Sequence, residues 1–481
     1  MLLVWLSPII LFLILSATRY VPAMTAALLA LTLSAFVVVG VGPLAVTPLQ
    51  FLSIFVAGAW IAVPAVAVIL AGLYFTEVLA TAATRSDVPD AASTVSAREL
   101  GTTCLFLGPF IETATGFGVG YVVAVSGVMR AGIGPAGALA LAAFSQCLVP
   151  WGALGVGTKI SAAIIAMPLE DITWRIAIVV APVLWLMVVF YWQIARAAGV
   201  EFSVAQKIED LLCVTTLSLL LIATSKMLPI ELAGLTAIGP VLLFRIWRRE
   251  GRQLLTTMAL RRATPYLLLI LLLGLTKLAP DVRSYLSAPA FTPGQGAPLF
   301  APLSSPAIAL VLASILGCLA HGHWSGLSDG IGRAVSKGMR ACIMTILLVA
   351  LAWIVVRSGI AEAFANAIRE SFGDFAALIV PMLGALGGYL TGSNTGAGSL
   401  AMPVAASLTS NAGLLAWIAA ASIMAGSIFT AFSPVRFAMG QAISGANNHD
   451  AGKALRSLIP FALVTVGTAV LTAFLAGLWV S

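Results

Sequence analysis

The chain has 481 residues, of which 60% are hydrophobic and only 9% charged, and its mean hydropathy is +1.07. These values exclude a soluble globular domain and indicate an all-α protein that crosses a membrane many times. The net charge of +7 does not indicate nucleic-acid binding, because the basic residues lie between apolar segments, where they orient the chain in a membrane.

Apolar windows long enough to span a bilayer follow one another along the chain. A window of about 17 to 25 residues suffices for one helical crossing. Such windows predict about twelve transmembrane helices, at 2–17, 21–42, 51–75, 135–158, 174–195, 209–226, 229–247, 263–279, 304–320, 341–357, 412–432 and 457–479.

Two further apolar stretches, residues 100–130 and 374–408, are too rich in glycine and proline for one continuous helix. Broken backbone at membrane depth is tolerated only inside protein or along a cavity. We therefore expect each stretch to form a re-entrant hairpin of two half-helices. The segments that follow them, 149–158 and 427–434, also contain helix breakers, and paired interruptions of this kind point to a transporter's binding site.

Arginines gather in one connection, 245–262, which predicts a basic cytoplasmic loop. Counting crossings outward from it makes the two hairpins enter from opposite sides. The expected organisation is a first transmembrane repeat at 1–195, connecting or scaffold helices at 196–303 and a second, inverted repeat at 304–481. The connecting helices could equally form a homodimer interface.

Glu112 is a single carboxylate in the middle of the first predicted hairpin. A carboxylate at bilayer depth costs roughly 3 kcal/mol even on a lenient insertion scale, so it calls for an explanation. One interpretation is a proton carrier that couples protonation to substrate binding. The other is a structural cap, in which Glu112 accepts hydrogen bonds from the free N–H groups of the next half-helix.

The half-helix ends at the four broken segments form a seat for a small anion, since free N–H groups and the helix dipole favour negative charge there. Small residues in membrane helices also serve close packing, as the pair Gly116 and Gly120 illustrates. The candidate substrate-binding residues are Thr115, Gly116, Gly118, Gly152, Gly155, Thr391, Gly392, Ser393, Asn394, Thr395, Ser433 and Arg436. For Lys159, near a predicted helix end, snorkelling to the membrane interface is the favoured interpretation.

No cofactor or metal is expected. The chain has no Walker motif, and no cluster of histidine, cysteine or acidic residues shows metal-ligand spacing. No histidine accompanies the hydroxyl groups of the broken helices, which argues against an enzyme.

Four motifs resemble those of the bacterial L-lactate permease family, whose members also handle glycolate. Phe110 to Gly120 is similar to its Glu-Gly-Ala-Ala-Gly-Phe-Gly signature, and Trp151 to Gly155 to its Phe-Gly-Ala-Met-Gly. Leu390 to Thr395 is similar to Leu-Thr-Gly-Ser-Asp-Thr, and Ser433-Pro434 to its Ser-Pro. The order and spacing of the motifs also agree.

The resemblance implies a divergent member of a family with an inverted-repeat transporter fold in the bacterial inner membrane. It implies proton-coupled uptake of lactate or a similar 2-hydroxy monocarboxylate, with Glu112 as the proton-coupling residue. The chain departs from the family in carrying Asn394 where Asp is usual and in the added charge of Arg436. A sodium-coupled carboxylate transporter and an anion or sulfonate exporter are the alternatives.

Overall fold

The computed structural model describes residues 1–18, 21–83, 96–251, 257–293, 299–321 and 326–480. Within these residues the chain is helical, and the one bridge between extended residues joins Phe291 and Phe300. Eight helices are long and apolar enough to cross a membrane, or up to eleven if each bent pair is one span. The predicted all-α polytopic class is confirmed, whereas the count of twelve crossings stays a prediction.

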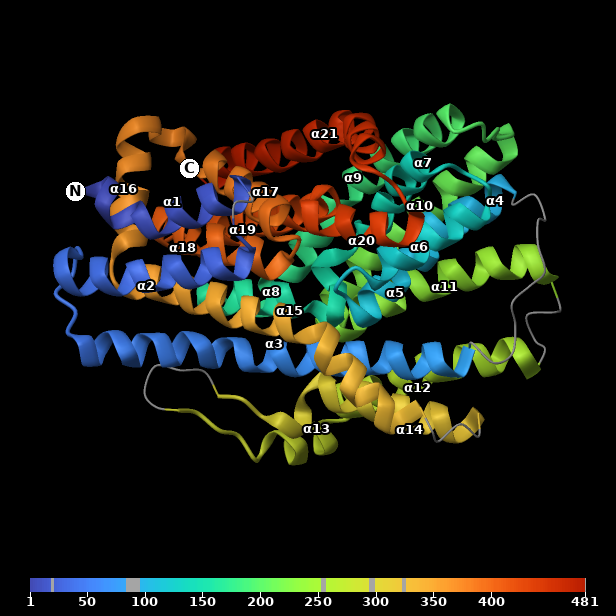
Figure 1. The fold of residues 1–481 in the computed structure, drawn as a ribbon, viewed down its shortest axis with the longest axis horizontal. Helices are drawn as coiled ribbons and strands as arrows, with labels where there is room; N and C mark the ends of the chain where they lie inside the picture. The colour runs from blue at the N-terminus through green and yellow to red at the C-terminus, as the bar shows by residue number, and fades with distance from the viewer. Residues whose placement is uncertain (19–20, 84–95, 252–256, 294–298, 322–325, 481) are drawn as a thin grey trace.

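One group of helices is built around two long, continuous members (Figure 1). The two longest neighbours, α3 and α15, lie side by side because Gly58 lets their backbones approach: a Cβ there would lie 2.8 Å from Cα of Ala350. The group comprises α1 (Leu2–Thr18), α2 (Ala23–Val41), α3 (Pro48–Ala83), α12 (Thr257–Leu278), α13 (Pro280–Ser287), η5 (Pro302–Ser304), α14 (Pro306–His321) and α15 (Gly326–Arg357).

The first part of a second group surrounds the predicted first hairpin. Several of its helices are short or broken, and others are long enough to span a membrane. They are α4 (Ala97–Gly101), η1 (Thr102–Leu107), α5 (Gly108–Thr115), α6 (Val119–Arg130), α7 (Pro135–Ala142), η2 (Ala143–Gln146), η3 (Val149–Trp151), α8 (Gly152–Ile164), α9 (Leu169–Ala197), α10 (Val204–Met227) and α11 (Ile230–Glu250).

The second part of this group comes from the C-terminal third of the chain and packs against the first through α8, α9 and α18. Its helices are α16 (Ile360–Phe372), η6 (Gly373–Leu378), α17 (Ile379–Thr391), α18 (Asn394–Leu408), α19 (Ala412–Phe429), η7 (Thr430–Phe432), α20 (Pro434–Ser444) and α21 (Asn448–Val480). Both predicted hairpin stretches are thus pairs of helices that pack on each other, α5 with α6 and α17 with α18. Their re-entrance in a membrane stays a prediction.

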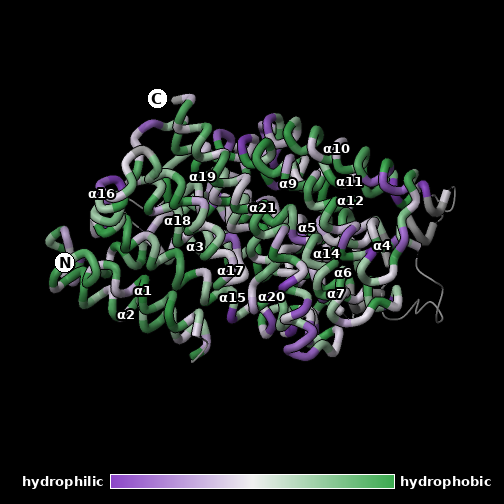
Figure 2. Tube along the Cα trace, turned by 90° about the horizontal axis from the view of Figure 1, so that it is seen from above, coloured by the Kyte–Doolittle hydropathy of each residue, from purple (hydrophilic) through white to green (hydrophobic). Residues whose placement is uncertain are grey.

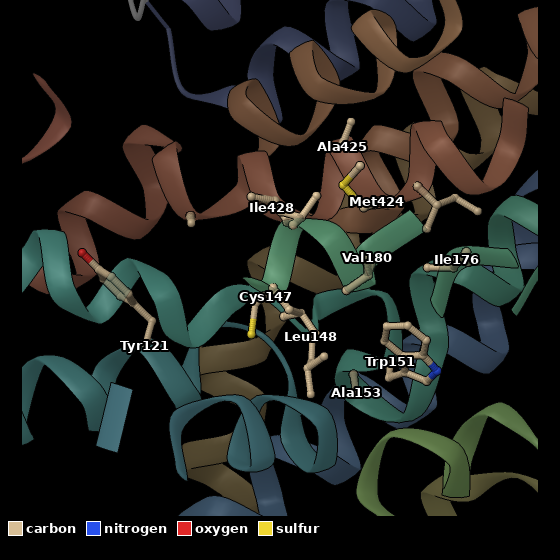
Figure 3. Packing of buried hydrophobic residues seen from close by; sticks show 14 of the residues in the cluster. Tyr121, Cys147, Leu148, Trp151, Ala153, Ile176, Val180, Met424, Ala425 and Ile428 are labelled. Carbon is tan, nitrogen blue, oxygen red and sulfur yellow. The ribbon is translucent and has the colours of Figure 1, made fainter. Parts of the chain in front are cut away.

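The apolar core joins the two parts of the second group. Figure 3 shows Met424 and Ile428 of α19 opposite Cys147 and Leu148, which precede the break in α8. Along the whole trace, hydrophobic residues dominate and hydrophilic colour is limited to short stretches such as α16 (Figure 2). Small and large apolar side chains are buried between the helices, and further large apolar side chains are exposed on the outside.

Helices extend into the predicted basic loop at 245–262 from both ends, and its place on the cytoplasmic side stays a prediction. Helix α11 continues to Glu250 and α12 begins at Thr257, so most of the segment is helical. Arg245 is buried and contacts Glu209 at 3.0 Å and Asp210 at 2.8 Å on α10. Arg252 lies outside the described residues. The positive charge of Arg245 therefore compensates carboxylates inside the protein, which a count of loop arginines cannot detect.

Candidate functional site

The first break separates α5 from α6 at Gly116, Phe117 and Gly118. All three residues have positive φ, at 73°, 57° and 82°. Glycine adopts this region freely, but a bulky residue such as phenylalanine does so at a cost of about 1–3 kcal/mol. The surrounding structure must therefore hold Phe117 in place.

Glu112 lies on α5 with its carboxylate directed at the start of α6, and only 1% of the residue is exposed. Its Oε1 accepts a hydrogen bond from the Gly118 N–H at 3.0 Å, and its Oε2 accepts one from the Gly120 N–H at 3.1 Å. Oε1 also lies 3.5 Å from Nη2 of Arg436. The carboxylate thus caps the α6 N-terminus, as the structural interpretation expected, and it has a cationic neighbour as well.

The second break lies within the span assigned to α8, directly after η3. Ala153, Leu154 and Gly155 have φ of 49°, 58° and 78°, so the backbone makes a left-handed turn before the helix resumes. This turn faces the first break: a Cβ on Gly116 would lie 2.5 Å from the Cβ of Ala153. Two strained segments therefore hold each other, an arrangement that concentrates at functional sites.

The third break lies between α17 and α18. Gly392 has φ of 64°, and the Ser393 N–H donates to Oγ1 of Thr391 at 3.2 Å. The side chain of Ser393, the residue before α18, does not cap the N-terminus of this helix. Nδ2 of Asn394, the first helical residue, lies 3.5 Å from Oγ1 of Thr158 on α8, and its Oδ1 has no hydrogen-bond partner in the described region.

The fourth break precedes α20, where Ser433 begins the helix by accepting a hydrogen bond from the Arg436 N–H at 3.1 Å. A Cβ on Gly392 would lie 2.7 Å from Oγ of Ser433, so the third and fourth breaks touch. The Arg436 side chain turns back to the first break, and a Cβ on Gly118 would collide with its guanidinium. The Arg436 Nε has no partner among the described atoms.

The four breaks therefore form a closed ring of neighbours. Gly116 contacts the α8 break, Gly157 of α8 approaches Asn394, Gly392 approaches Ser433, and Arg436 returns to Gly118. Helices from both predicted repeats contribute, so most residues selected from the sequence come together. Gly152 also belongs here, since its Cβ would lie 3.5 Å from the Glu112 carbonyl oxygen.

Three more of the selected residues lie at or beside the breaks. The Thr115 hydroxyl donates to the Ile111 carbonyl at 2.7 Å. Gly155 packs against Ile230 of α11. Thr395 is buried in the first turn of α18, with its N–H directed toward the uncapped end.

Two residues that the sequence reasoning did not select take part in the site. Gly120 supplies an N–H to Glu112, and Thr158 contacts Asn394 and donates to the Pro150 carbonyl at 2.6 Å. Thr158 could have been found from its position directly after the glycines of the interrupted helix. Nζ of Lys159 lies 2.7 Å from Oε1 of Glu231, and the snorkelling interpretation of this residue stays a prediction.

A ring of helix breaks with buried charges and free N–H groups is typical of secondary transporters, which bind their substrates at discontinuous helices.

Comparison with known families narrows this class. The family model described as L-lactate permease matches residues 283–403, so the predicted resemblance to that family is confirmed over this segment. The partial match fits a divergent member. It includes the third break but not the other three. No curated protein matches the chain. The match to a permease family agrees with the multi-pass helical structure and with transport of lactate-like substrates.

Proposed function

We propose that the chain takes up L-lactate or a similar short 2-hydroxy carboxylate together with a proton across the bacterial inner membrane. The substrate binds within the ring of four breaks. The observation that carries this proposal is the N-terminus of α18, which is buried and has no side-chain cap, whereas a carboxylate already occupies the N-terminus of α6.

The substrate carboxylate binds at the N-terminus of α18, just as the Glu112 carboxylate binds at the N-terminus of α6. The N–H groups of Asn394, Thr395 and Gly396 precede the first intrahelical bond, which the Ala397 N–H makes to the Ser393 carbonyl. Free N–H groups at a helix start bind a carboxylate well. The unpaired Oδ1 of Asn394 accepts a hydrogen bond from the 2-hydroxyl group, which selects hydroxy acids over their unsubstituted analogues.

Arg436 couples substrate binding to protonation of Glu112. It lies beside Glu112, is itself buried, and has an Nε without a partner. When the substrate carboxylate binds near Arg436, a second anion shares the same guanidinium. Two carboxylates around one cation favour protonation of one of them, so the substrate and a proton on Glu112 enter together.

The test is uptake of labelled L-lactate into proteoliposomes under an imposed pH gradient, with and without sodium. The wild-type protein should accumulate lactate only when the gradient is directed inward, and sodium should have no effect. Glu112→Gln should lose the dependence on the gradient. Glu362→Gln, on the exposed face of α16, is the matched control and should behave as wild type.

Two results would contradict the proposal. Uptake that ignores the gradient but requires sodium would replace the proton by sodium. Flux that neither responds to an ion gradient nor saturates with lactate would instead indicate a channel or exporter.

A further inference from the structure

A second group of charges lies away from the ring of breaks. Oε1 of Glu231 on α11 accepts a hydrogen bond from Nζ of Lys159 at 2.7 Å and forms an ion pair with Nζ of Lys277 at 3.3 Å. Lys277 also donates to the Ser304 carbonyl at 2.7 Å. An ammonium group has three donors, and these contacts use two of them. Lys277 therefore keeps one N–H for another acceptor.

An open pocket of about 390 Å³ lies beside Lys277, at the bend between α12 and α13. We call it the α12–α13 pocket, and it is lined by Lys277, Leu278, Pro280, Arg283, Ser284 and Ser287. No carboxylate lines it. Arg283 is exposed on α13, and the structure records no ion pair for it within the described residues. The pocket thus presents two cations and two hydroxyl groups.

A series of contacts between charged and polar residues connects the pocket to the ring of breaks. Lys277 shares Glu231 with Lys159, and Lys159 follows Thr158, whose hydroxyl lies 3.5 Å from Nδ2 of Asn394. The side chains Lys277, Lys159 and Glu231 with Arg283 carry a net charge of +2. The Glu231 carboxylate, held between two lysines, occupies the kind of place that a free carboxylate would take.

We propose that the α12–α13 pocket is a second, peripheral binding site for a short carboxylate, which holds the anion before it reaches the ring of breaks. This inference rests on the proposed function for the identity of the anion. Lys277 and Arg283 bind its carboxylate, and Ser284 or Ser287 donates to it. Basic walls raise the local concentration of an anion and increase its rate of arrival.

The experiment uses a cysteine in the pocket as a reporter on purified full-length protein in detergent. All five native cysteines are buried, so Ser284→Cys provides an accessible thiol. Its labelling rates with an anionic and a cationic methanethiosulfonate reagent are compared. Ala45→Cys is the control, because it is exposed and no charged residue occurs between 21 and 76.

Relative to Ala45→Cys, the pocket cysteine should favour the anionic reagent about fivefold at low salt, and high salt should abolish the preference. Adding Arg283→Gln should reduce the preference about threefold. L-lactate should slow labelling at position 284 and leave position 45 unchanged. Equal rates at the two positions, or a preference that Arg283→Gln leaves intact, would overturn the proposal.

The labelling result and the transport result are independent. An anionic preference that persists in a protein without lactate uptake would support the pocket and contradict the proposed function. Normal proton-coupled uptake of lactate without an anionic preference at position 284 would support the proposed function and contradict the pocket. Absence of lactate protection despite coupled uptake would also overturn the pocket as a substrate site.

Discussion

The first and third helix breaks have similar glycine-rich sequences but differ in what occupies the N-terminus that follows. At the first break, Glu112 binds the N–H groups of Gly118 and Gly120 and lies beside Arg436. At the third break, α18 begins at Asn394 without a side-chain cap. One half-helix thus carries its own anion and the other is free to bind one from outside.

The two halves of the ring therefore have different roles. A half-helix that is already capped is a fixed structural element, whose charge is balanced within the protein. A buried N-terminus without a cap is costly unless a ligand completes it. The comparison therefore predicts that changes at the first break affect stability together with proton coupling, while changes at the third mainly affect substrate affinity.

The largest effect is expected for Glu112→Gln at the first break. The substitution leaves the buried Arg436 guanidinium without its counter-charge, and breaking a buried pair costs about 3–5 kcal/mol. The free energy of unfolding in mixed micelles should fall by this amount. The double variant Glu112→Gln with Arg436→Met should recover most of the loss, because no charge is left unpaired. Equal stability of Glu112→Gln and wild type would show that the pair contributes nothing.

The breaks themselves could be predicted from the sequence because their signals are local. Clusters of glycine and proline in apolar runs, such as glycine at 116, 118 and 392 and proline at 150 and 434, predict interrupted helices, and the structure breaks at these places. The paired hairpins and interrupted helices also suggested that both predicted halves contribute to one site. The ring of contacts agrees with this inference.

The pairings across the ring could not be predicted in the same way. Arg436 and Glu112 lie far apart in the chain, and the choice between proton carrier and cap depended on which N–H groups Glu112 reaches in three dimensions. The left-handed turn at Ala153 and Leu154 has no local signal either, because neither residue prefers positive φ. Tertiary packing imposes it, with Gly116 on one side.

Arg245 illustrates a different limit. The rule that arginines collect in cytoplasmic loops counts charges along the chain. The rule does not take account of Glu209 and Asp210, which lie on the neighbouring helix and bind the Arg245 guanidinium inside the protein.

The next largest effect is expected for Gly118→Ala, also at the first break. Its φ of 82° is strained for alanine, and the new Cβ would collide with the Arg436 guanidinium. We expect a loss of about 2–3 kcal/mol in unfolding free energy, made up of backbone strain and a displaced arginine. Gly445→Ala separates the two contributions, since its φ is 67° and nothing lies within 4 Å of its Cβ. The control should lose only about 1 kcal/mol. Equal losses in the two variants would mean that Arg436 moves aside freely.

The smallest change in free energy is expected at the third break, and it should appear in binding. Asn394→Ala removes the unpaired Oδ1 and the contact to Thr158, but it leaves no charge unpaired, so stability should change little. The KM for L-lactate uptake should rise about tenfold, which corresponds to one lost hydrogen bond of about 1.4 kcal/mol. Asn366→Ala, on the exposed face of α16, is the matched control. The effect should vanish for propionate, which has no 2-hydroxyl group for Oδ1 to bind. An equal rise in KM for both acids would mean that Asn394 orders the N-terminus of α18 and does not recognise the hydroxyl group.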